Sequence, residues 1–457
     1  MTASPQPNVG LQRIISSYGL KLDVVARAHR EQAVINGDLD VRTTKSTVSL
    51  WASGHRRPQG RSCEYLAQAL SKLTERLVTL EEIGYGDAQP QELPTLSTDP
   101  VAATTDLGRA LMDTDRRTFL QQAVYVSAAL ALPLGYDHEA VARTLRARQP
   151  GARVGRAEIA AVRQTIRAFR AADEQLGGGH GLSAATFYLT DAAAPMLSGK
   201  FGDDAVRFDA YSAVAELAYL LAWKHHDLNQ EGAAQRFYLL GYQLACEADY
   251  HGHGSWMLRA LAHQALNLKQ PAHCVDLAEE ALRRSAGKVD AQTRALLLIT
   301  SARAYGATRQ KQKAAAALLS AEDALLRTGD QVADYALAVG PVGATISSHT
   351  GKTLSELGDH RGAEKHRRAA LVGRDPEEFR RIHALTMSEL AGTLDKQGRM
   401  DEAVEAWGHS LDLMDGISSA RNTESIKSMR STMRRYTARG VPGAGTLSER
   451  ARASLAA

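Results

Sequence analysis

Hydrophobic residues recur at helical spacing along almost the whole chain, and the alternation that predicts strands is weak everywhere. Residues 11–84 hold short apolar-periodic segments separated by Gly, Asn, Asp and Pro. Residues 86–106 contain three prolines and no apolar period, and Ala- and Leu-rich helical patterns then continue to about residue 420. The pattern therefore predicts an all-α protein with a small N-terminal domain, a linker and a long helical region.

A short helix is predicted within the stretch TTKSTVSLWASGHRRP, residues 43–58. Thr44 can cap its N-terminus, and Gly54 suits a left-handed stop. Val48 and Trp51 fall on one face, and the other face carries short polar side chains, one lysine and no acid, as in helices that lie in a DNA groove. We expect base contacts from Lys45, Ser46, Ser49 and Leu50, and phosphate contacts from Arg42, Thr44, Thr47, Arg56 and Arg57.

The charge of the chain is segregated. The 457 residues carry a net charge of only +4, which excludes a uniformly basic coat for nucleic acid. Residues 42–61 nevertheless hold five cations and no acid, whereas residues 86–114 hold five acids and one arginine. A local DNA contact followed by an acidic linker fits this distribution. The alternative for the short helix is a core-only role in an unrelated small bundle.

The long helical region contains a repeat of small residues. A small residue is followed by another twelve positions later and by a third seven positions after that, and the whole unit recurs at intervals of 40, 40, 49 and 40 residues. Two helices can cross closely only where both side chains are small, so this offset predicts stacked helical hairpins. The five units are Ala222, Ala234 and Gly241; Ala262, Cys274 and Ala281; Ala302, Ala314 and Ala321; Gly351, Ala363 and Ala370; and Ala391, Ala403 and Ser410.

These patterns divide the chain into five parts. The predicted fold is an N-terminal helix-turn-helix domain followed by a tetratricopeptide-like solenoid of helical hairpins. The parts are a DNA-binding domain at 1–86, an acidic linker at 87–114, connecting helices at 115–150, the repeat domain at 151–420, and a basic C-terminal helix with a flexible tail at 421–457.

A family resemblance supports this division. STVSLWASGHRRP followed by LAQALS resembles a lambda-repressor-like (Xre-type) helix-turn-helix. The chain is similar to actinobacterial regulators with C-terminal tetratricopeptide repeats, a group that includes negative regulators of sporulation and antibiotic production. The similarity lies in the order of that module and four later motifs, LEEIGYGD, DRRTFL, GGGHGLSAATFYLTDAAAPML and QRFYLLGYQLACEAD. The resemblance covers most of the chain to about residue 420. It implies a sequence-specific transcriptional regulator of development or secondary metabolism.

The repeats also predict a ligand groove. In a tetratricopeptide-like stack, the residue after the small packing position of each first helix points into the concave side. This column and the one a turn before it run from aromatic residues to cations without an acid. Such a lining would suit an extended peptide or an anionic small molecule, unless the linker or the C-terminal tail fills it. The lining residues are Tyr219, Trp223, Arg259, His263, Asn267, Arg303 and Lys352, with Asn267 placed to hold a peptide backbone.

Other motifs do not support an enzyme or a metal site. HTGKT at 349–353 lacks the leading glycine of a phosphate loop, and LGGGHG at 176–181 follows no strand, so a helix break is favoured there. No nucleophile is paired with a base, and we expect neither catalytic residues nor a cofactor. The histidine-rich positions lack zinc spacing, so a metal is not expected at His225, His226, Asp249, His251 or His253.

The expected location is the cytoplasm, with the protein on the nucleoid when it is bound to DNA. Three cysteines cannot form a disulfide framework, and no apolar run reaches the roughly 18 residues of a membrane span. DRRTFLQQAVYVSAALALPLG imitates an export signal but follows more than 100 residues that themselves read as folded; a start near Met112 would change that interpretation. We expect a homodimer on a palindromic double-stranded DNA operator. The rival classes are a scaffold without DNA binding and an enzyme hidden in the Gly- and His-rich loops.

Overall fold

The chain forms two compact units, each described by itself. Unit 1 comprises Met1–Pro94, Asp113–Val126 and Asn229–Ala233, and unit 2 comprises Thr95–Met112, Ser127–Leu228 and Ala234–Ala457. The computed structural model describes residues 7–36, 38, 41–59, 61–74, 76, 78–80, 82–85, 93–112, 119–120, 123, 125–137, 139, 141, 145, 151–248, 252–270, 273–327 and 332–456. The DRRTFL segment therefore lies largely outside the described residues.

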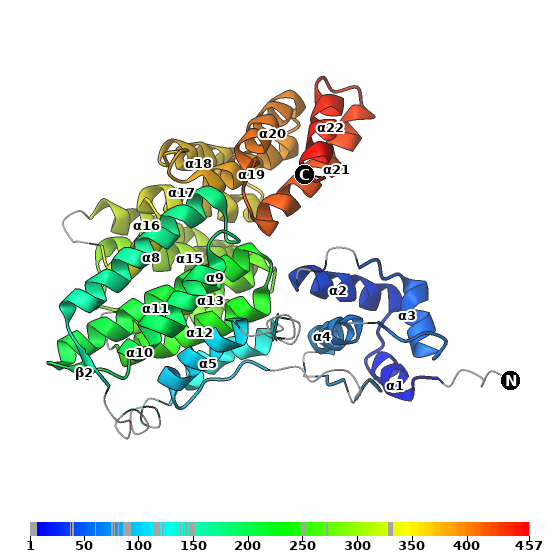
Figure 1. The fold of residues 1–457 in the computed structure, drawn as a ribbon. Helices are drawn as coiled ribbons and strands as arrows, with labels where there is room; N and C mark the ends of the chain where they lie inside the picture. Colours follow the sequence, from blue (N-terminus) through cyan, green and yellow to red (C-terminus); the bar gives the residue numbers. More distant parts are fainter. Residues whose placement is uncertain are drawn as a thin grey trace. The chain divides into compact units, whose positions relative to one another are not determined.

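The described residues 7–85 of unit 1 form helices α1 to α4, which surround one apolar core (Figure 1). The helices bury residues at helical spacing, as the periodicity predicts, and the third is the short helix expected from TTKSTVSLWAS. Its two buried residues, Val48 and Trp51, are part of the same core. The elements are α1 (Val9–Ser17), α2 (Leu22–Ile35), α3 (Lys45–Ala52) and α4 (Ser62–Thr74).

Unit 2 begins with a helix inside the segment that was predicted as a linker. The carboxylate of Asp99 accepts the N–H groups of Val101 and Ala102 at 3.1 and 3.0 Å and so caps α5 (Pro100–Met112). Pro100 is the first residue of this helix, where a proline is tolerated because the N–H it lacks has no intrahelical partner. The linker prediction is therefore wrong for these residues, because a proline that starts a helix was read as one that breaks it.

Short and irregular elements follow before the hairpins. The described part of the predicted connecting helices includes a 3₁₀ helix, Ser127–Gly135. The two strands each span two residues and pair in parallel, Arg153 with Lys200 and Val154 with Phe201. The elements are β1 (Arg153–Val154), α8 (Arg156–Leu176), α9 (Leu182–Tyr188), a π-helical turn (Leu189–Ala193), α10 (Ala194–Met196) and β2 (Lys200–Phe201).

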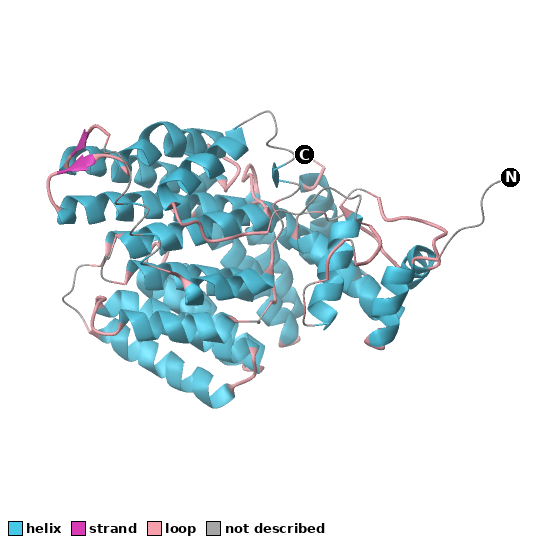
Figure 2. Cartoon of the chain, turned by 90° about the horizontal axis from the view of Figure 1, so that it is seen from below, coloured by secondary structure: helices cyan, strands magenta, loops and turns pink. Residues whose placement is uncertain are grey.

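The remainder of unit 2 is a series of helical hairpins, and the all-α prediction is confirmed. Figure 2 shows helices throughout this unit, with the β1–β2 pair as the only strands in the part of the chain that the structure describes. The hairpins are α11 (Asp204–Asp227) with α12 (Glu231–Glu247), α13 (His253–Asn267) with α14 (Cys274–Ser285), α15 (Ala291–Ala307) with α16 (Lys311–Leu326), α17 (Val342–Leu357) with α18 (His360–Val372), and α19 (Arg380–Lys396) with α20 (Met400–Met414), while a 3₁₀ helix (Asp334–Val339) precedes α17.

The small residues of the predicted repeat lie where the helices of each hairpin cross. All fifteen are buried. A Cβ added at Gly351 would come within 3.1 Å of the Ala363 carbonyl oxygen, its partner twelve residues on. The thiol of Cys274 likewise donates to the carbonyl of Ala262 at 3.8 Å. Close approach of the two backbones therefore explains the twelve-residue offset.

Enlarging one of these positions should be costly. Ala314 is fully buried in α16, whereas its neighbour Ala315 is exposed on the same helix. We expect Ala314→Leu to lower the free energy of unfolding by about 1–3 kcal/mol because the extra atoms force the α15–α16 crossing apart. Ala315→Leu is the matched control and should change it by less than about 0.5 kcal/mol. Denaturant unfolding checks both, and similar losses for the two variants would contradict the crossing.

The C-terminal residues form a further hairpin, so the predicted flexible tail is wrong. α21 (Ala420–Thr437) and α22 (Ala444–Ser454) bury Met433 and Leu447 in one core cluster with α19 and α20. Gly440 and Gly443 have positive φ and make the turn between the two helices. The signal was present: the apolar residues of 444–454 recur at helical spacing, but the glycine- and proline-containing turn before them was read as the start of fraying.

Candidate functional site

The N-terminus of α3 is fixed by a reciprocal cap. The Thr44 hydroxyl accepts the N–H of Thr47 at 3.2 Å, and the Thr47 hydroxyl accepts the N–H of Thr44 at 3.3 Å. This satisfies backbone donors that a helix start leaves without partners. The two hydroxyls predicted to contact phosphates therefore also set the position at which α3 begins.

The other end of α3 is held by α1 and the residue before it. The carbonyl of Ala52 accepts the N–H of Asn8 at 3.0 Å and the side-chain amide of Gln12 at 2.9 Å. Val48 and Trp51 are 0% and 4% exposed in the core. With both ends and the inner face fixed, the outer face of α3 has a defined orientation relative to unit 1.

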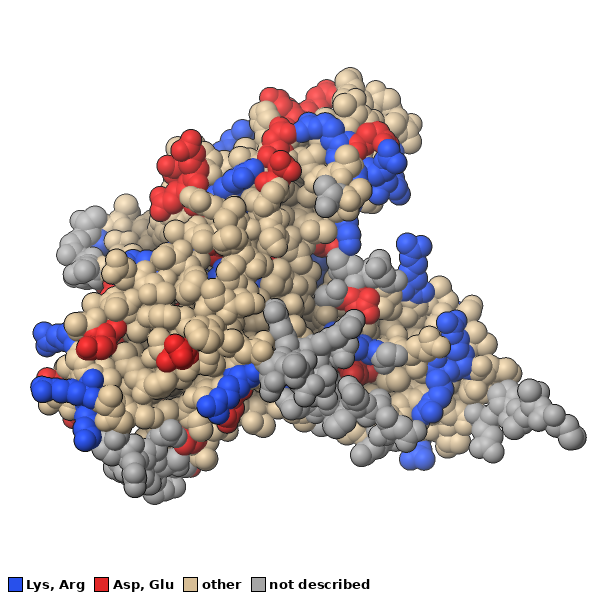
Figure 3. Space-filling view, viewed as in Figure 1, with Lys and Arg blue, Asp and Glu red and all other residues tan. Residues whose placement is uncertain are grey.

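The outer face of α3 is exposed, short in side chain and without acids. Lys45, Ser46, Ser49 and Leu50 are all exposed, and Leu50 has 41% of its surface accessible although it is apolar. Described residues 41–59 include no Asp or Glu. In Figure 3 the Lys and Arg side chains of unit 1 form a run on the side of α3. The flanking cations Arg42, Arg56 and Arg57 are exposed as well, and Arg57 lies over the Tyr85 ring at 5.5 Å.

A buried histidine that the sequence did not single out anchors the start of α3. His29 on α2 contacts the Ser62 carbonyl through Nε2 at 3.0 Å and the Thr43 hydroxyl through Nδ1 at 2.9 Å. Burial lowers the pKa of His29 to about 4, so the ring is neutral at pH 7. Nε2 then donates to the carbonyl and Nδ1 accepts from the hydroxyl. The sequence signal for this role was the position of His29, which falls on the buried face of α2.

The stability of unit 1 should fall as the pH falls from about 6.5 to about 4. The unfolded His29 takes up a proton near pH 6.5, whereas the folded one resists protonation until about pH 4. Acid therefore favours the unfolded state, by roughly 3 kcal/mol once both forms are protonated. Hydrogen exchange of the α3 amides, corrected for intrinsic rates, measures this loss. His29→Gln should flatten the dependence, and an equally steep profile in that variant would contradict the assignment.

The predicted groove residues come together on the first helices of successive hairpins. The rings of Trp223 and His263 are stacked with centroids 6.1 Å apart. The Asn267 amide lies 3.2 Å from Nε2 of His226, and Nη1 of Arg303 donates to Oδ1 of Asn267 at 3.4 Å. Helices α11, α13 and α15 thus contribute to one continuous set of contacts.

Three of the predicted lining residues, Tyr219, Arg259 and Arg303, are buried. Tyr219 is 8% exposed and Arg259 is 3% exposed. The Arg259 guanidinium lies over the Trp256 ring at 4.5 Å, and its Nε donates to the Leu296 carbonyl at 3.3 Å. These contacts occupy the Arg259 side chain within the fold.

An acid absent from the predicted lining lies beside Lys352. Oε1 of Glu389 is 3.0 Å from Nζ of Lys352, and its Oε2 is 3.7 Å from Nε of Arg367. Glu389 lies on α19, in the next hairpin. It precedes by three residues the position after Ala391, which is where the predicted lining would continue on this helix. Burial raises the pKa of this carboxyl, but Lys352 and Arg367 outweigh burial and hold the pKa below its usual value. Lys352 is therefore partly neutralised.

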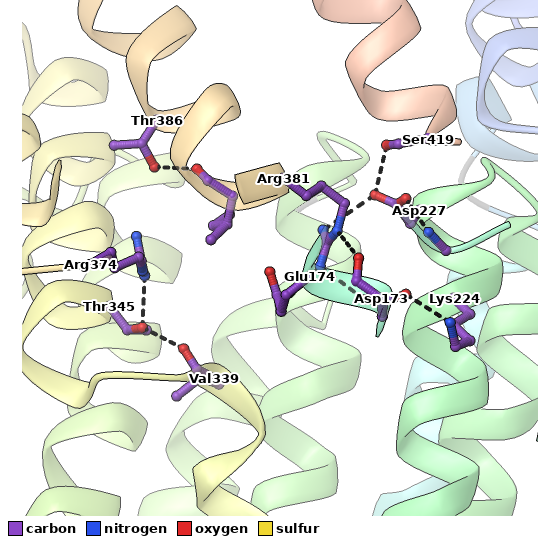
Figure 4. A network of polar contacts seen from close by, with 12 residues as sticks. Asp173, Glu174, Lys224, Asp227, Val339, Thr345, Arg374, Arg381, Thr386 and Ser419 are labelled. Carbon is purple, nitrogen blue, oxygen red and sulfur yellow. Dashed lines mark hydrogen bonds and ion pairs between the residues drawn. The ribbon is translucent and has the colours of Figure 1, made fainter. Parts of the chain in front are cut away.

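Unit 2 contains a buried ionic network that the sequence did not reveal (Figure 4). Nη2 of Arg381 donates to carboxylates of Asp173 and Glu174, at 2.9 Å in each case, and its Nη1 donates to Asp227 at 3.4 Å. Arg381, Asp173 and Asp227 are at most 1% exposed. Burial alone lowers the pKa of the Arg381 guanidinium, but the three carboxylates outweigh it and raise that pKa.

This network joins helices that are far apart in the sequence. Lys224 on α11 contacts Asp173 at 3.2 Å, and the hydroxyl of Ser419, which caps α21, donates to Asp227 at 3.0 Å. The N–H of Gly178 donates to Asp227 at 2.9 Å, so the glycine-rich loop forms part of the same joint. Each carboxylate accepts from at least one protein donor, although Oε2 of Glu174 has no hydrogen-bond partner among the described residues, so the arrangement supports a structural role.

The remaining sequence motifs have ordinary structural places. Residues 349–353 lie inside α17 and form no loop, and His225 and His226 lie within α11. His253 is the first residue of α13, while Asp249 and His251 fall outside the described residues. Where the structure describes the chain, no three His, Cys, Asp or Glu side chains are grouped so that they could hold a metal ion. None of the described helices is long and apolar enough to cross a membrane.

Comparison with known proteins adds one match. Residues 11–86 match the family described as the SP15 N-terminal domain, and the matched stretch contains α2, α3 and α4 and most of α1. No curated protein matches the chain.

Proposed function

We propose that the chain is a sequence-specific DNA-binding regulator of transcription, in development or secondary metabolism, of the Xre-type class with tetratricopeptide-like repeats. Unit 1 would read DNA, and unit 2 would sense a ligand or peptide, mediate dimerisation, or do both. The observation that carries the proposal is the outer face of α3, which is exposed, acid-free and held in a fixed orientation by Val48, Trp51 and the two capped ends.

The chemistry of this face suits base edges in the major groove. Lys45 can donate to the acceptors of guanine, and the exposed Leu50 can contact a thymine methyl group. Small serines between them allow the backbone of α3 to approach the bases. Arg42 and Arg56 flank the helix and are exposed, as phosphate contacts require.

One observation favours the rival class, an interaction scaffold without DNA binding. Residues 36–44 separate α2 from α3, whereas a helix-turn-helix usually has a turn of about 3–4 residues. His29 and Arg30 fix this connection, because His29 contacts the Thr43 hydroxyl and the Arg30 side chain donates to the Thr43 carbonyl. A long connection whose end is held at Thr43 is compatible with DNA binding. Measurement of DNA affinity distinguishes a DNA-binding regulator from a scaffold.

Two substitutions in unit 1 separate base reading from phosphate binding. Lys45→Ala should cost about 1–3 kcal/mol on the preferred DNA sequence and relax one base preference. Arg56→Ala should weaken preferred and random DNA alike, because a phosphate contact carries no sequence information. Lys72→Ala is the control, since Lys72 lies on α4 and pairs with Glu31 at 3.0 Å. Fluorescence anisotropy measures all three, and identical effects of Lys45→Ala and Arg56→Ala on both DNAs would contradict the roles.

The proposal includes a homodimer in the cytoplasm that joins the nucleoid when it binds. One short helix reads too few base pairs for specificity, and a two-fold partner doubles the contacts. The operator would then be an imperfect palindrome. No catalytic residue, cofactor or metal enters the proposal.

A further inference from the structure

Several buried guanidinium N–H groups of unit 2 donate to no acceptor among the residues that the structure describes. Nε of Arg303, a residue 4% exposed, has no hydrogen-bond acceptor among the described residues. The same holds within the described chain for Nε and Nη1 of Arg374, which is 5% exposed, and for Nη1 of Arg421. Among the described residues, the Arg374 guanidinium makes one hydrogen bond, from Nη2 to the Thr345 hydroxyl at 2.8 Å (Figure 4). Buried donors without acceptors cost free energy and call for an explanation.

Two of these groups are linked by contacts to a pair of histidines: Arg303 donates to Asn267, whose amide lies 3.4 Å from Nδ1 of His263, and Arg421 reaches His263 through Trp223. Arg421 lies over the Trp223 ring at 5.4 Å, Trp223 stacks on His263, and the His263 and His349 ring centroids are 5.1 Å apart. Nε2 of His263 and Nδ1 of His349 also lack a hydrogen-bond partner in the described chain. We name the set of Arg303, Lys352, Arg374, Arg421, His263 and His349 the cationic cluster.

The cationic cluster carries more positive than negative charge. Glu389 pairs with Lys352, Glu356 acts on Arg303 and Glu174 acts on Arg374, so three carboxylates face the four cations of the cluster and the neighbouring Arg367. Burial lowers the pKa of His349 well below its usual value, and the charges of Arg303, Lys352 and Arg374 lower it further. The electrostatic field at the two rings is therefore positive, and an anion would relieve it.

The unmet groups specify the ligand's chemistry. A guanidinium has donors and no acceptor, so its partner must supply acceptor atoms, and charged acceptors form the stronger bonds. The phosphate group of an ester offers three acceptor oxygens and about −1.5 to −2 charge near pH 7, and inorganic phosphate carries a similar charge with at least two such oxygens. A single carboxylate would leave much of the excess charge unmatched. An apolar ligand end also has little to bind, because Trp223 already packs against His263, Arg381 and Arg421.

We propose that the cationic cluster binds a phosphate-type dianion, either inorganic phosphate or the phosphate group of a small phosphorylated molecule. Arg303 and Arg421 supply donors from α15 and from α21, and His263 and His349 supply ring nitrogens that have no partner among the described residues. The inference deepens and rests on the sensing role proposed for unit 2. It replaces an extended peptide with a compact anion as the ligand.

Calorimetric titration of the full-length protein at low ionic strength tests this with inorganic phosphate and with phenyl phosphate. We expect saturable binding of at least one, and tighter binding of the ester would identify a phosphorylated molecule as the source. Arg303→Gln should weaken the affinity for the bound phosphate compound at least tenfold. Arg421→Gln changes a half-buried residue and should weaken the same affinity, so it serves as the test if Arg303→Gln does not fold. Arg283→Gln, at an exposed position of α14, should leave phosphate binding unchanged. Wild-type binding near pH 6 should also take up protons, because the anion raises the pKa of the histidines.

Controls in unit 1 separate this inference from DNA binding. Arg56→Gln should not alter phosphate binding, since Arg56 belongs to unit 1. Absence of saturable binding by either compound overturns the inference, and so does binding lost in Arg56→Gln but retained in both Arg303→Gln and Arg421→Gln. A protein that binds phosphate but no DNA supports the cluster and overturns the DNA proposal; the reverse result overturns the cluster alone.

Discussion

Arg381→Met should lower the free energy of unfolding of unit 2 by about 3–5 kcal/mol. Arg381 is fully buried and contacts Asp173, Glu174 and Asp227, so its removal leaves carboxylates inside the fold without their charge partner. The loss is large because buried charges that lose a partner cannot return to water while the helices stay packed. Denaturant unfolding followed by circular dichroism measures it.

Two further variants make this test specific. Arg361→Met removes a cation from an exposed position of α18 and should cost less than about 0.5 kcal/mol. Adding Asp227→Asn to Arg381→Met should recover part of the loss, because the double variant removes one of the stranded charges. Equal losses for Arg361→Met and Arg381→Met would show that the network does not stabilise the joint between α8, α11 and α19.

DNA affinity should fall by about 60- to 500-fold between 50 and 200 mM salt. If a half-site pairs three to five of the exposed cations of unit 1 with phosphates, the logarithm of affinity falls against the logarithm of salt with a slope of roughly −3 to −4.5. Arg56→Ala should make the slope shallower by about one contact, whereas Ser46→Ala should leave it unchanged because serine carries no charge. A slope near zero for the wild type would exclude phosphate pairing as the basis of binding.

The repeats of unit 2 could be predicted because a close helix crossing tolerates only small side chains, so Ala314 or Gly351 marks the crossing directly in the sequence. The short helix of unit 1 could also be predicted from the sequence, because Thr44 caps its N-terminus and Val48 and Trp51 pack in the core. α5 was missed for a local reason: Asp99 and Pro100 begin a helix as readily as they break one.

The polar sites of unit 2 were less accessible to sequence reasoning. The partners of Arg381 stand more than 150 positions away from it, and no spacing rule connects such positions before the hairpins stack. Glu389 changed the predicted lining for a similar reason, because it reaches Lys352 from the next hairpin. Comparing equivalent positions of successive hairpins identifies residues that are neighbours in the stack. It does not identify side chains such as Glu389, which reach the same place from a neighbouring turn of a helix.

Selection of bound fragments from a random-sequence DNA pool by the full-length protein tests the central claim most directly. The account predicts enrichment of an imperfect palindrome whose half-sites lie about one helical turn, or a multiple of it, apart. It also predicts that Lys45→Ala changes the base composition at one position of each half-site. A folded wild-type protein that enriches no sequence, while it still forms its helical units, would contradict the assignment of α3 as a DNA-reading helix and favour the scaffold class.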